Sequence, residues 1–218
     1  MKSFLIRNHH SRFREKALLI AFIRLFNWYF EKFICILGGP LYAALFNLRL
    51  KLVNCNDTKI VNKKNFYLVI DKNFPDIKIS FKNKAYATYA YKFGLKERAN
   101  TLAEEYLLNK IEFNDGDVIY DCGANIGDFK LWFKYQDINI KYKGFEPSPE
   151  EFNLLSKNTF PSENQNIALW NKDDYLDFYL NSDEADSALI KPKYFKEVVK
   201  VKTKRLDYFI DEKVKLLK

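Results

Sequence analysis

The stretch Asp117 to Gly127, with the sequence D-V-I-Y-D-C-G-A-N-I-G, decides the fold predicted for this chain. Its apolar part, Val118 to Tyr120, has the β-rich character of a buried parallel strand. Asn114 to Gly116 predicts a turn before this strand, and residues 128–133 predict a helix after the glycine-containing loop. A strand, a glycine turn and a helix in this order let a ligand approach bare backbone at a helix N-terminus.

The glycines of this loop lie four residues apart, whereas a pyrophosphate-binding loop has the spacing G-x-G-x-x-G. An acid stands ahead of them, which disfavours phosphates and favours a ligand with a cationic part. S-adenosylmethionine fits, because it has a sulfonium, an ammonium group and a ribose diol but no phosphate. The alternative is an ordinary strand-to-helix turn. The predicted cofactor-binding residues of the loop are Asp121, Gly123, Ala124, Asn125 and Gly127.

The next predicted strand, Tyr142 to Phe145, ends in Glu146 and is followed by Pro147-Ser148-Pro149. Glu146 lies roughly 20 residues past the glycine turn, where nucleotide-binding folds place the acid that binds ribose hydroxyls. Its two oxygens can accept hydrogen bonds from both hydroxyls of a diol. We expect Ser148 to cap a helix over 150–158, and this second feature favours the cofactor interpretation over the ordinary turn.

These two motifs, D-C-G-A-N-I-G and G-F-E-P-S-P-E-E-F-N-L-L-S-K-N, closely resemble the FkbM family of S-adenosylmethionine-dependent methyltransferases. The resemblance continues more weakly through residues 166–169, a third predicted strand, and residues 203–207. It covers roughly residues 99–218. It implies a Rossmann-like, doubly wound and mainly parallel sheet and O-methylation of a hydroxyl, often on a sugar. Asn166 is a further candidate, as a partner of the adenine amino group.

The composition argues against nucleic-acid binding and against a disulfide framework or metal site. The net charge of +8 is concentrated in residues 1–64, which hold 12 Lys or Arg and three acidic residues; the remainder is close to neutral. A general nucleic-acid groove over the remainder is therefore not expected. Three cysteines without a C-x-x-C pair argue against a disulfide framework or zinc site, and no metal is expected. A reducing, cytoplasmic setting follows from the cysteine usage.

Residues 1–64 are predicted to be a basic, apolar, helical extension, and residues 65–218 the methyltransferase domain. Ala17 to Leu37 forms a wide apolar helix face with a narrow polar stripe, but charges interrupt it. We expect residues 13–50 either to lie in a membrane interface, at the inner face of a membrane, or to pack against the domain or a second subunit. Residues 59–64 are predicted to be a linker, and residues 66–70, 77–81, 177–180 and 198–203 to be strands.

The final residues, 214–218, begin another apolar strand, which the FkbM family continues into an I-D-x-E-G segment at the active site. From this resemblance we expect a C-terminally truncated domain. Methyl transfer to a hydroxyl benefits from a general base, and no His lies in the predicted domain. The candidates are Asp207 and Asp183. The alternatives are an inactive truncated fold that binds a membrane or partner through its N-terminal arm, and a nicotinamide-dependent dehydrogenase.

Overall fold

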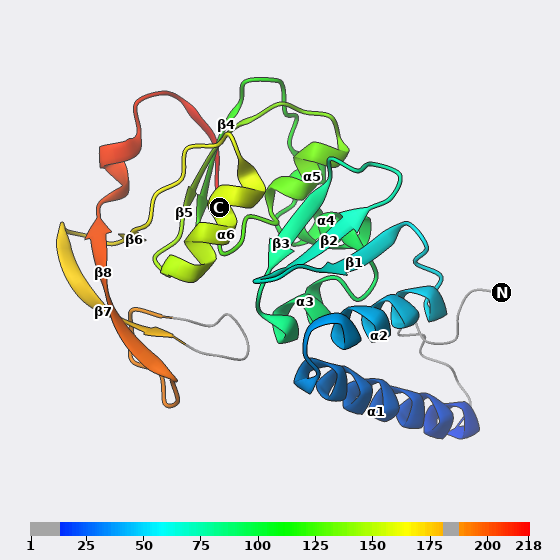
Figure 1. Cartoon of the computed structure of the whole chain (residues 1–218). Coiled ribbons are helices and arrows are strands. Elements are labelled where there is room, and N and C mark those ends of the chain that lie inside the picture. The colour runs from blue at the N-terminus through cyan, green and yellow to red at the C-terminus, as the bar shows by residue number, and fades with distance from the viewer. Residues whose placement is uncertain (1–13, 181–187) are drawn as a thin grey trace.

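The computed structural model describes the backbone of residues 14–180 and 188–218, and side chains from Leu25 onward within these ranges. Strands and helices alternate between residues 118 and 159, whereas the described part of the first 52 residues is helical except at Leu37 and Gly38 (Figure 1). The helices are α1 (Arg14–Ile36), α2 (Gly39–Leu52), α3 (Lys84–Ala90), α4 (Leu95–Glu105), α5 (Lys130–Tyr135) and α6 (Pro149–Thr159), with 3-10 helices η1 (Leu108–Lys110) and η2 (Leu206–Phe209). The strands are β1 (Thr58–Asn62), β2 (Tyr67–Asp71), β3 (Lys78–Phe81), β4 (Val118–Cys122), β5 (Lys141–Phe145), β6 (Ala168–Leu169), β7 (Asp174–Leu180), β8 (Glu197–Lys204) and β9 (Val214–Leu217).

The described strands form three three-stranded sheets, in the orders β1-β2-β3, β5-β4-β9 and β6-β8-β7. The fold is therefore mixed α/β. Three of the six strand pairings are parallel, so the strands do not form one mainly parallel sheet as the sequence predicted. The reason is that β6, β7 and β8 pair with one another, and one isolated bridge, Phe145 to Gln165, joins the segment before β6 to β5.

The sheet β5-β4-β9 contains the predicted first two core strands, and both predictions are confirmed. All its pairings are parallel, and Asp121 of β4 lies opposite Gly144 of β5. The apolar run at the end of the sequence is also a strand, β9, which pairs with β4 on the side away from β5. The carboxyl ends of the three strands consequently meet at one edge of the sheet.

The antiparallel sheet β1-β2-β3 corrects one prediction. Residues 59–64 were expected to be a linker, but Thr58–Asn62 is strand β1, paired along its whole length with β2. Ile60 is only 1% exposed, so this strand contributes to the core. Lys59 is exposed, as are Lys63 and Lys64 beyond the strand, and these lysines gave the segment its linker-like composition. The strands predicted over residues 66–70 and 77–81 are confirmed as β2 and β3.

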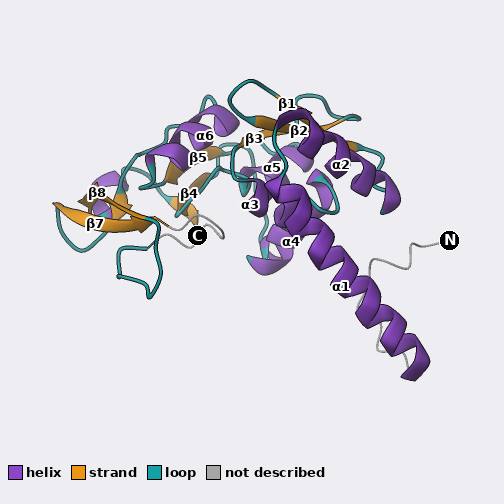
Figure 2. Cartoon of the chain, turned by 60° about the horizontal axis from the view of Figure 1, so that its bottom comes forward, coloured by secondary structure: helices purple, strands orange, loops and turns teal. Residues whose placement is uncertain are grey.

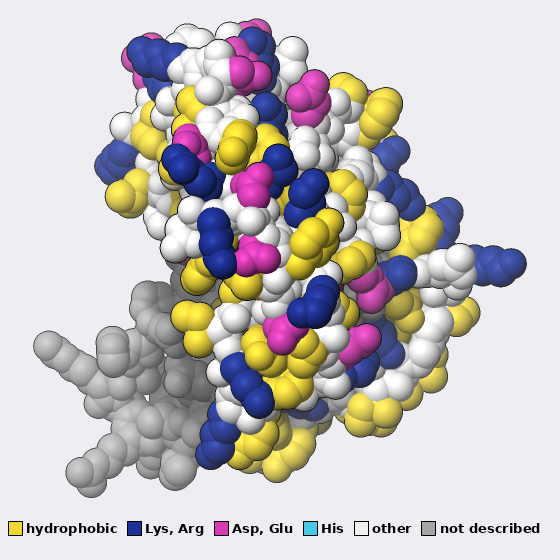
Figure 3. All heavy atoms as spheres, turned by 90° about the vertical axis from the view of Figure 1, so that its left-hand side faces the viewer, with side chains coloured by type: hydrophobic (Ala, Val, Ile, Leu, Met, Phe, Trp, Pro, Cys, Tyr) yellow, Lys and Arg dark blue, Asp and Glu magenta, His cyan; other side chains and the backbone are white. Residues whose placement is uncertain are grey.

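The third sheet contains the strands predicted over residues 177–180 and 198–203, and both are longer than expected. The strand predicted over residues 166–169 is reduced to the two residues of β6, which pair with β8. Figure 3 views the side of the molecule that carries β7 and β8, where basic, acidic and hydrophobic side chains are interspersed.

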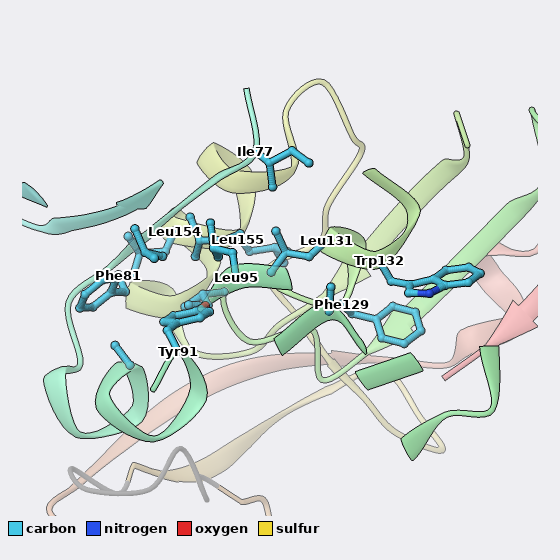
Figure 4. Close-up of a cluster of buried hydrophobic side chains, with 14 of the residues drawn as sticks. Ile77, Phe81, Tyr91, Leu95, Phe129, Leu131, Trp132, Leu154 and Leu155 are labelled. Carbon is cyan, nitrogen blue, oxygen red and sulfur yellow. The ribbon is translucent and has the colours of Figure 1, made fainter. Parts of the chain in front are cut away.

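A continuous hydrophobic core joins the first two sheets and their helices. Figure 4 shows its central part, where side chains from β3, α4, α5 and α6 converge. Phe81, Leu95, Leu131 and Leu155 are each at most 1% exposed. The same cluster includes Phe46 and Leu50 of α2, so α2 packs on the body of the protein.

The long apolar helix predicted over residues 17–37 is confirmed as α1. Its C-terminal part contacts α2 and α3, and the rest extends away from the body (Figure 2). Within the part of the chain that the structure describes, no helix has the length and apolar character needed to cross a bilayer.

Candidate functional site

The loop that follows β4 curls over the end of β5. The backbone N–H groups of Gly123 and Ala124 both donate to the carbonyl oxygen of Phe145, at 2.9 and 3.0 Å. Gly123 has a φ of +73° and Asn125 a φ of +49°, so the chain turns twice through the left-handed region. This turn presents the backbone around Gly123 to the space beyond the strand ends.

Gly127 closes the loop against α6. Its φ is +84°, and a methyl group added to it would lie 2.5 Å from Cγ2 of Thr159 and 2.8 Å from Cδ1 of Leu155. A side chain at this position would therefore force the loop and the helix apart. Gly127 is explained by close packing and left-handed geometry, which are structural requirements of the loop.

Glu146 lies at the carboxyl end of β5 and is 7% exposed. Its Oε1 accepts a hydrogen bond from the backbone N–H of Ser148 at 2.9 Å, and its Oε2 accepts one from that of Asn125 at 2.8 Å. Each carboxylate oxygen can accept about two hydrogen bonds, so each retains capacity for one further donor. Burial raises the pKa of Glu146 to about 7, against the two backbone hydrogen bonds, which lower it.

A cavity of about 480 Å³ lies beside this carboxylate, within the range of sizes that hold small ligands. Its polar wall includes Gly123, Asn125, Glu146 and Ser148. Its apolar wall comes from the end of β5, from β6 and the residue after it, and from the third sheet with its flanking segment. The apolar lining residues are Phe145, Pro147, Ile167, Ala168, Leu169, Trp170, Phe178, Ala188, Leu189 and Ile190.

Asp121 does not line this cavity, although the sequence predicted that its carboxylate would attract a cationic ligand. It is fully buried, and its Oδ1 accepts a hydrogen bond from Lys218 Nζ at 2.6 Å while its Oδ2 accepts one from the Tyr142 hydroxyl. The Lys218 ammonium also lies 5.4 and 5.5 Å from the ring centroids of Tyr106 and Phe129. The cation that Asp121 binds in this structure therefore belongs to the protein itself.

The remaining predicted cofactor residues have structural contacts. Ala124 is buried, and the amide of Asn166 donates to the carbonyl oxygens of Glu146 and Pro147 at 2.8 and 3.0 Å. Asn166 thus holds the backbone behind Glu146 through its NH₂ group and does not line the cavity, and its contact with adenine stays a prediction. Of the seven predicted cofactor residues, Gly123, Asn125 and Glu146 line the cavity.

Of the two predicted general bases, the structure describes only Asp207, and it does not line the cavity. Asp207 is exposed, forms an ion pair with Arg205 and is absent from the cavity wall. Asp183 lies outside the described residues. Cys122 does line the cavity, and burial raises the pKa of its thiol to about 11, which agrees with a packing residue and not a thiolate nucleophile.

A second cavity, of about 600 Å³, adjoins the first across the N-termini of α3 and α6. The two share four lining residues: Asn83, Asn125, Ser148 and Glu151. The wall of the second cavity is more highly charged, with six Lys or Glu side chains. These are Lys82, Lys84, Glu150, Glu151, Lys196 and Glu197.

A buried ion pair beneath the loop was not predicted. Asp128 Oδ2 accepts hydrogen bonds from Arg98 Nε at 2.8 Å and from the Tyr86 hydroxyl at 2.6 Å. These contacts tie α3 and α4 to the residue that follows Gly127. Nothing local in the sequence marks Arg98 as a partner of Asp128, because 30 residues separate them. The apolar cavity wall at Trp170 and Ile190 was also not predicted from the sequence, because these residues lie far along the chain from the loop that they face.

Comparison with known proteins agrees with the resemblance in the sequence. Residues 121–218 match the family model of the methyltransferase FkbM domain, and the match confirms the predicted FkbM resemblance over that part of the chain. Over 53 residues the chain is 40% identical to the 31-O-demethyl-FK506 methyltransferase FkbM of Streptomyces tacrolimicus. That alignment covers 24% of this chain and 20% of the relative, so the chain matches about a fifth of the relative's length. No solved structure shows a significant match.

Proposed function

We propose that this chain, which is related to the FkbM methyltransferases over residues 121–218, transfers a methyl group from S-adenosylmethionine to a hydroxyl on a sugar or other small acceptor. One observation carries the proposal. Glu146, at the end of a parallel strand, keeps a hydrogen-bond acceptor site on each oxygen and faces a ligand-sized cavity.

The cavity suits this cofactor on three counts. The two available acceptor sites of Glu146 match a ribose diol, and the apolar wall around Phe145, Ile167 and Trp170 suits a purine ring. Gly123 has no side chain and faces open space, since a methyl group added to it would meet nothing within 4 Å. A ligand can therefore come close to its backbone.

The position of the cavity supports a Rossmann-like interpretation of the sheet β5-β4-β9. The chain leaves β4 to form β5 on one side and returns later to form β9 on the other side. Open parallel sheets bind their ligands at such a change of direction, outside the carboxyl ends of the strands. The cavity lies at the carboxyl ends of β4 and β5, in agreement with this rule.

We assign the acceptor to the second cavity, whose charged wall suits a ligand rich in hydroxyl groups. When bound, the cofactor supplies a methyl group on a sulfonium, which is a good leaving group. The protein then has to align the acceptor oxygen with that methyl group and remove the hydroxyl proton. Glu151 lines both cavities and accepts a hydrogen bond from the Ser148 hydroxyl, so we propose it as the group that takes this proton.

The test of the cofactor site is calorimetric titration of S-adenosylmethionine into the full chain and two variants. Glu146→Gln replaces one acceptor oxygen by an NH₂ group and removes the charge, so we expect about 10- to 100-fold weaker binding. Glu163→Gln is the matched control, because Glu163 is exposed and outside both cavity walls, and it should bind like the wild type. Absence of binding to the wild type, or equal binding by both variants, would contradict the proposal.

The test of the acceptor site uses Glu151→Gln. We expect this variant to keep its affinity for the cofactor and to lose at least about tenfold in methyl transfer to a glycan-derived hydroxyl acceptor. The readout is S-adenosylhomocysteine formed per minute at saturating cofactor, with Glu163→Gln again as the control. Unchanged turnover in Glu151→Gln would remove this residue from the mechanism while leaving the cofactor site intact.

A further inference from the structure

One face of α1 is apolar, aromatic and exposed. Six large hydrophobic side chains between residues 25 and 36 are 52–80% exposed. We call them the aromatic face of α1; they are Leu25, Phe26, Trp28, Tyr29, Phe33 and Ile36. Trp28 and Tyr29 are in edge-to-face contact, and Phe26 stacks on the half-buried Phe30. An exposed apolar patch of this extent on one helix indicates a surface that binds a membrane or another protein.

The opposite face of α1 is already occupied. Ile34 is fully buried in the core, and Cys35 Sγ contacts the Thr88 hydroxyl of α3 at 3.4 Å. Glu31 pairs with Arg49 of α2 at 2.8 Å. The helix is therefore fixed to the body by one side, and the aromatic face points away from it. Figure 2 shows α1 extending beyond the other elements.

The charges around the aromatic face are positive. Glu31 is the only acidic residue between positions 16 and 56, and its carboxylate is neutralised by Arg49, which is 7% exposed. Lys32 is exposed and lies 6.0 Å from the ring centroid of Trp28, so its ammonium belongs to the same face. The other basic residues of this stretch are Lys16, Arg24 and Lys51.

From these contacts we infer that the aromatic face of α1 docks on an anionic membrane surface, with the helix lying in the interface. Trp and Tyr side chains favour the boundary between headgroups and hydrocarbon, because each has an apolar body and a polar tip. Lys32 can bury its stem among the rings while its ammonium reaches the lipid phosphates. A second copy of the chain fits less well, since a symmetric contact would bring two Lys32 side chains together without an acid to pair them.

The test is cosedimentation of the full chain with two kinds of vesicle, one of phosphatidylcholine alone and one with about a third phosphatidylglycerol. The variant Phe26→Ser/Trp28→Ser/Phe33→Ser removes three exposed rings of the aromatic face. The matched control, Tyr175→Ser/Tyr194→Ser/Tyr208→Ser, removes three rings elsewhere that are 63–74% exposed in the wild type, against 52–62% for the rings removed from α1. All six positions are exposed, so both variants are expected to fold, and circular dichroism checks this.

We expect wild type and control to sediment with the anionic vesicles, and the α1 variant to bind about tenfold or more weakly. Binding to phosphatidylcholine vesicles should be weaker, and raising the salt to about 0.5 M should weaken binding to the anionic vesicles. The inference is overturned if the wild type stays in the supernatant or if the α1 variant binds like the control. It is also overturned if sedimentation velocity shows a dimer that the α1 variant dissolves, because the face would then be a protein interface.

Discussion

The carboxyl ends of β4 and β5 carry two buried acids in neighbouring positions, and the two acids have different kinds of hydrogen-bond partner. Asp121 is enclosed by side chains, with the Lys218 ammonium on one oxygen and the Tyr142 hydroxyl on the other. Glu146 is held by two backbone N–H groups and faces a cavity. Each oxygen of both carboxylates accepts one hydrogen bond, but Asp121 is fully buried and does not line the cavity, whereas the backbone positions Glu146 so that its remaining acceptor sites face the cavity.

This difference separates a structural acid from a ligand-binding acid. The pKa of Lys218 is raised by the charge and the hydrogen bond of Asp121, although burial opposes the shift, so the pair holds β9 to the end of β4 as an ion pair. Among the described residues, the hydrogen-bond partners of Glu146 are backbone N–H groups and no basic side chain, and they offset only part of the pKa rise that burial causes. We therefore expect Asp121 to contribute mainly to the free energy of unfolding and Glu146 mainly to ligand binding.

The largest expected effect is that of Asp121→Ala on stability. This change leaves the Lys218 ammonium, whose side chain is 14% exposed, without its counter-ion, and we expect a loss of about 3–5 kcal/mol in the free energy of unfolding. Urea denaturation followed by circular dichroism measures it. The double variant Asp121→Ala/Lys218→Met should recover part of the loss. A change below about 1 kcal/mol would mean that the ion pair does not hold the sheet together.

Gly127→Ala tests whether the loop between the two acids is fixed by its packing on α6. The added methyl group meets Thr159 and Leu155 at a φ of +84°, and we expect a loss of about 3 kcal/mol. Gly116→Ala is the matched control. Its φ is +85° but a methyl group there meets nothing within 4 Å, so only the backbone strain of about 1 kcal/mol should appear. Equal losses in the two variants would contradict the packing argument.

The pH dependence of the free energy of unfolding tests the buried state of Glu146. The folded protein holds a proton on Glu146 up to a pKa of about 7, above the usual value of 4.5. The stabilisation linked to this proton is fully present below pH 4.5 and is lost as the pH rises to about 7, for a total of up to about 3 kcal/mol. The difference in unfolding free energy between wild type and Glu146→Gln should follow this curve. A flat difference would contradict the buried state of Glu146.

The smallest expected effect is the pH dependence of ligand affinity. A ribose diol donates to the ionised carboxylate, so binding should strengthen as the pH rises through about 7. We expect the affinity for S-adenosylhomocysteine to increase about tenfold between pH 6 and pH 8. Calorimetric titration at several pH values measures this, and Glu146→Gln should show little change. Stronger binding at pH 6 than at pH 8 would mean that the neutral acid binds the ligand.

The sequence predicted those parts of the molecule that local residues determine. The run Val118 to Tyr120 is apolar enough to be identified alone, and Ser148-Pro149 marks the start of α6. The strand before Glu146 contains Lys141 and Lys143, and it was predicted from its place directly ahead of Glu146-Pro147. Strand β1 has little local signal, because it depends on pairing with β2. The partner of Asp121 lies 97 residues away, so no spacing rule could show that a lysine of the protein already occupies its carboxylate.

The most direct test of this account is a paired titration of S-adenosylmethionine into Asp121→Asn and Glu146→Gln, with the folded fraction of each sample measured by denaturation. We expect Asp121→Asn to be the less stable protein and yet to bind, per folded molecule, within about threefold of the wild type. Glu146→Gln should be the more stable of the two and bind about 10- to 100-fold more weakly than the wild type. The reverse pattern, with Asp121→Asn losing affinity and Glu146→Gln keeping it, would contradict the assignment of Glu146 as the acid that binds the cofactor.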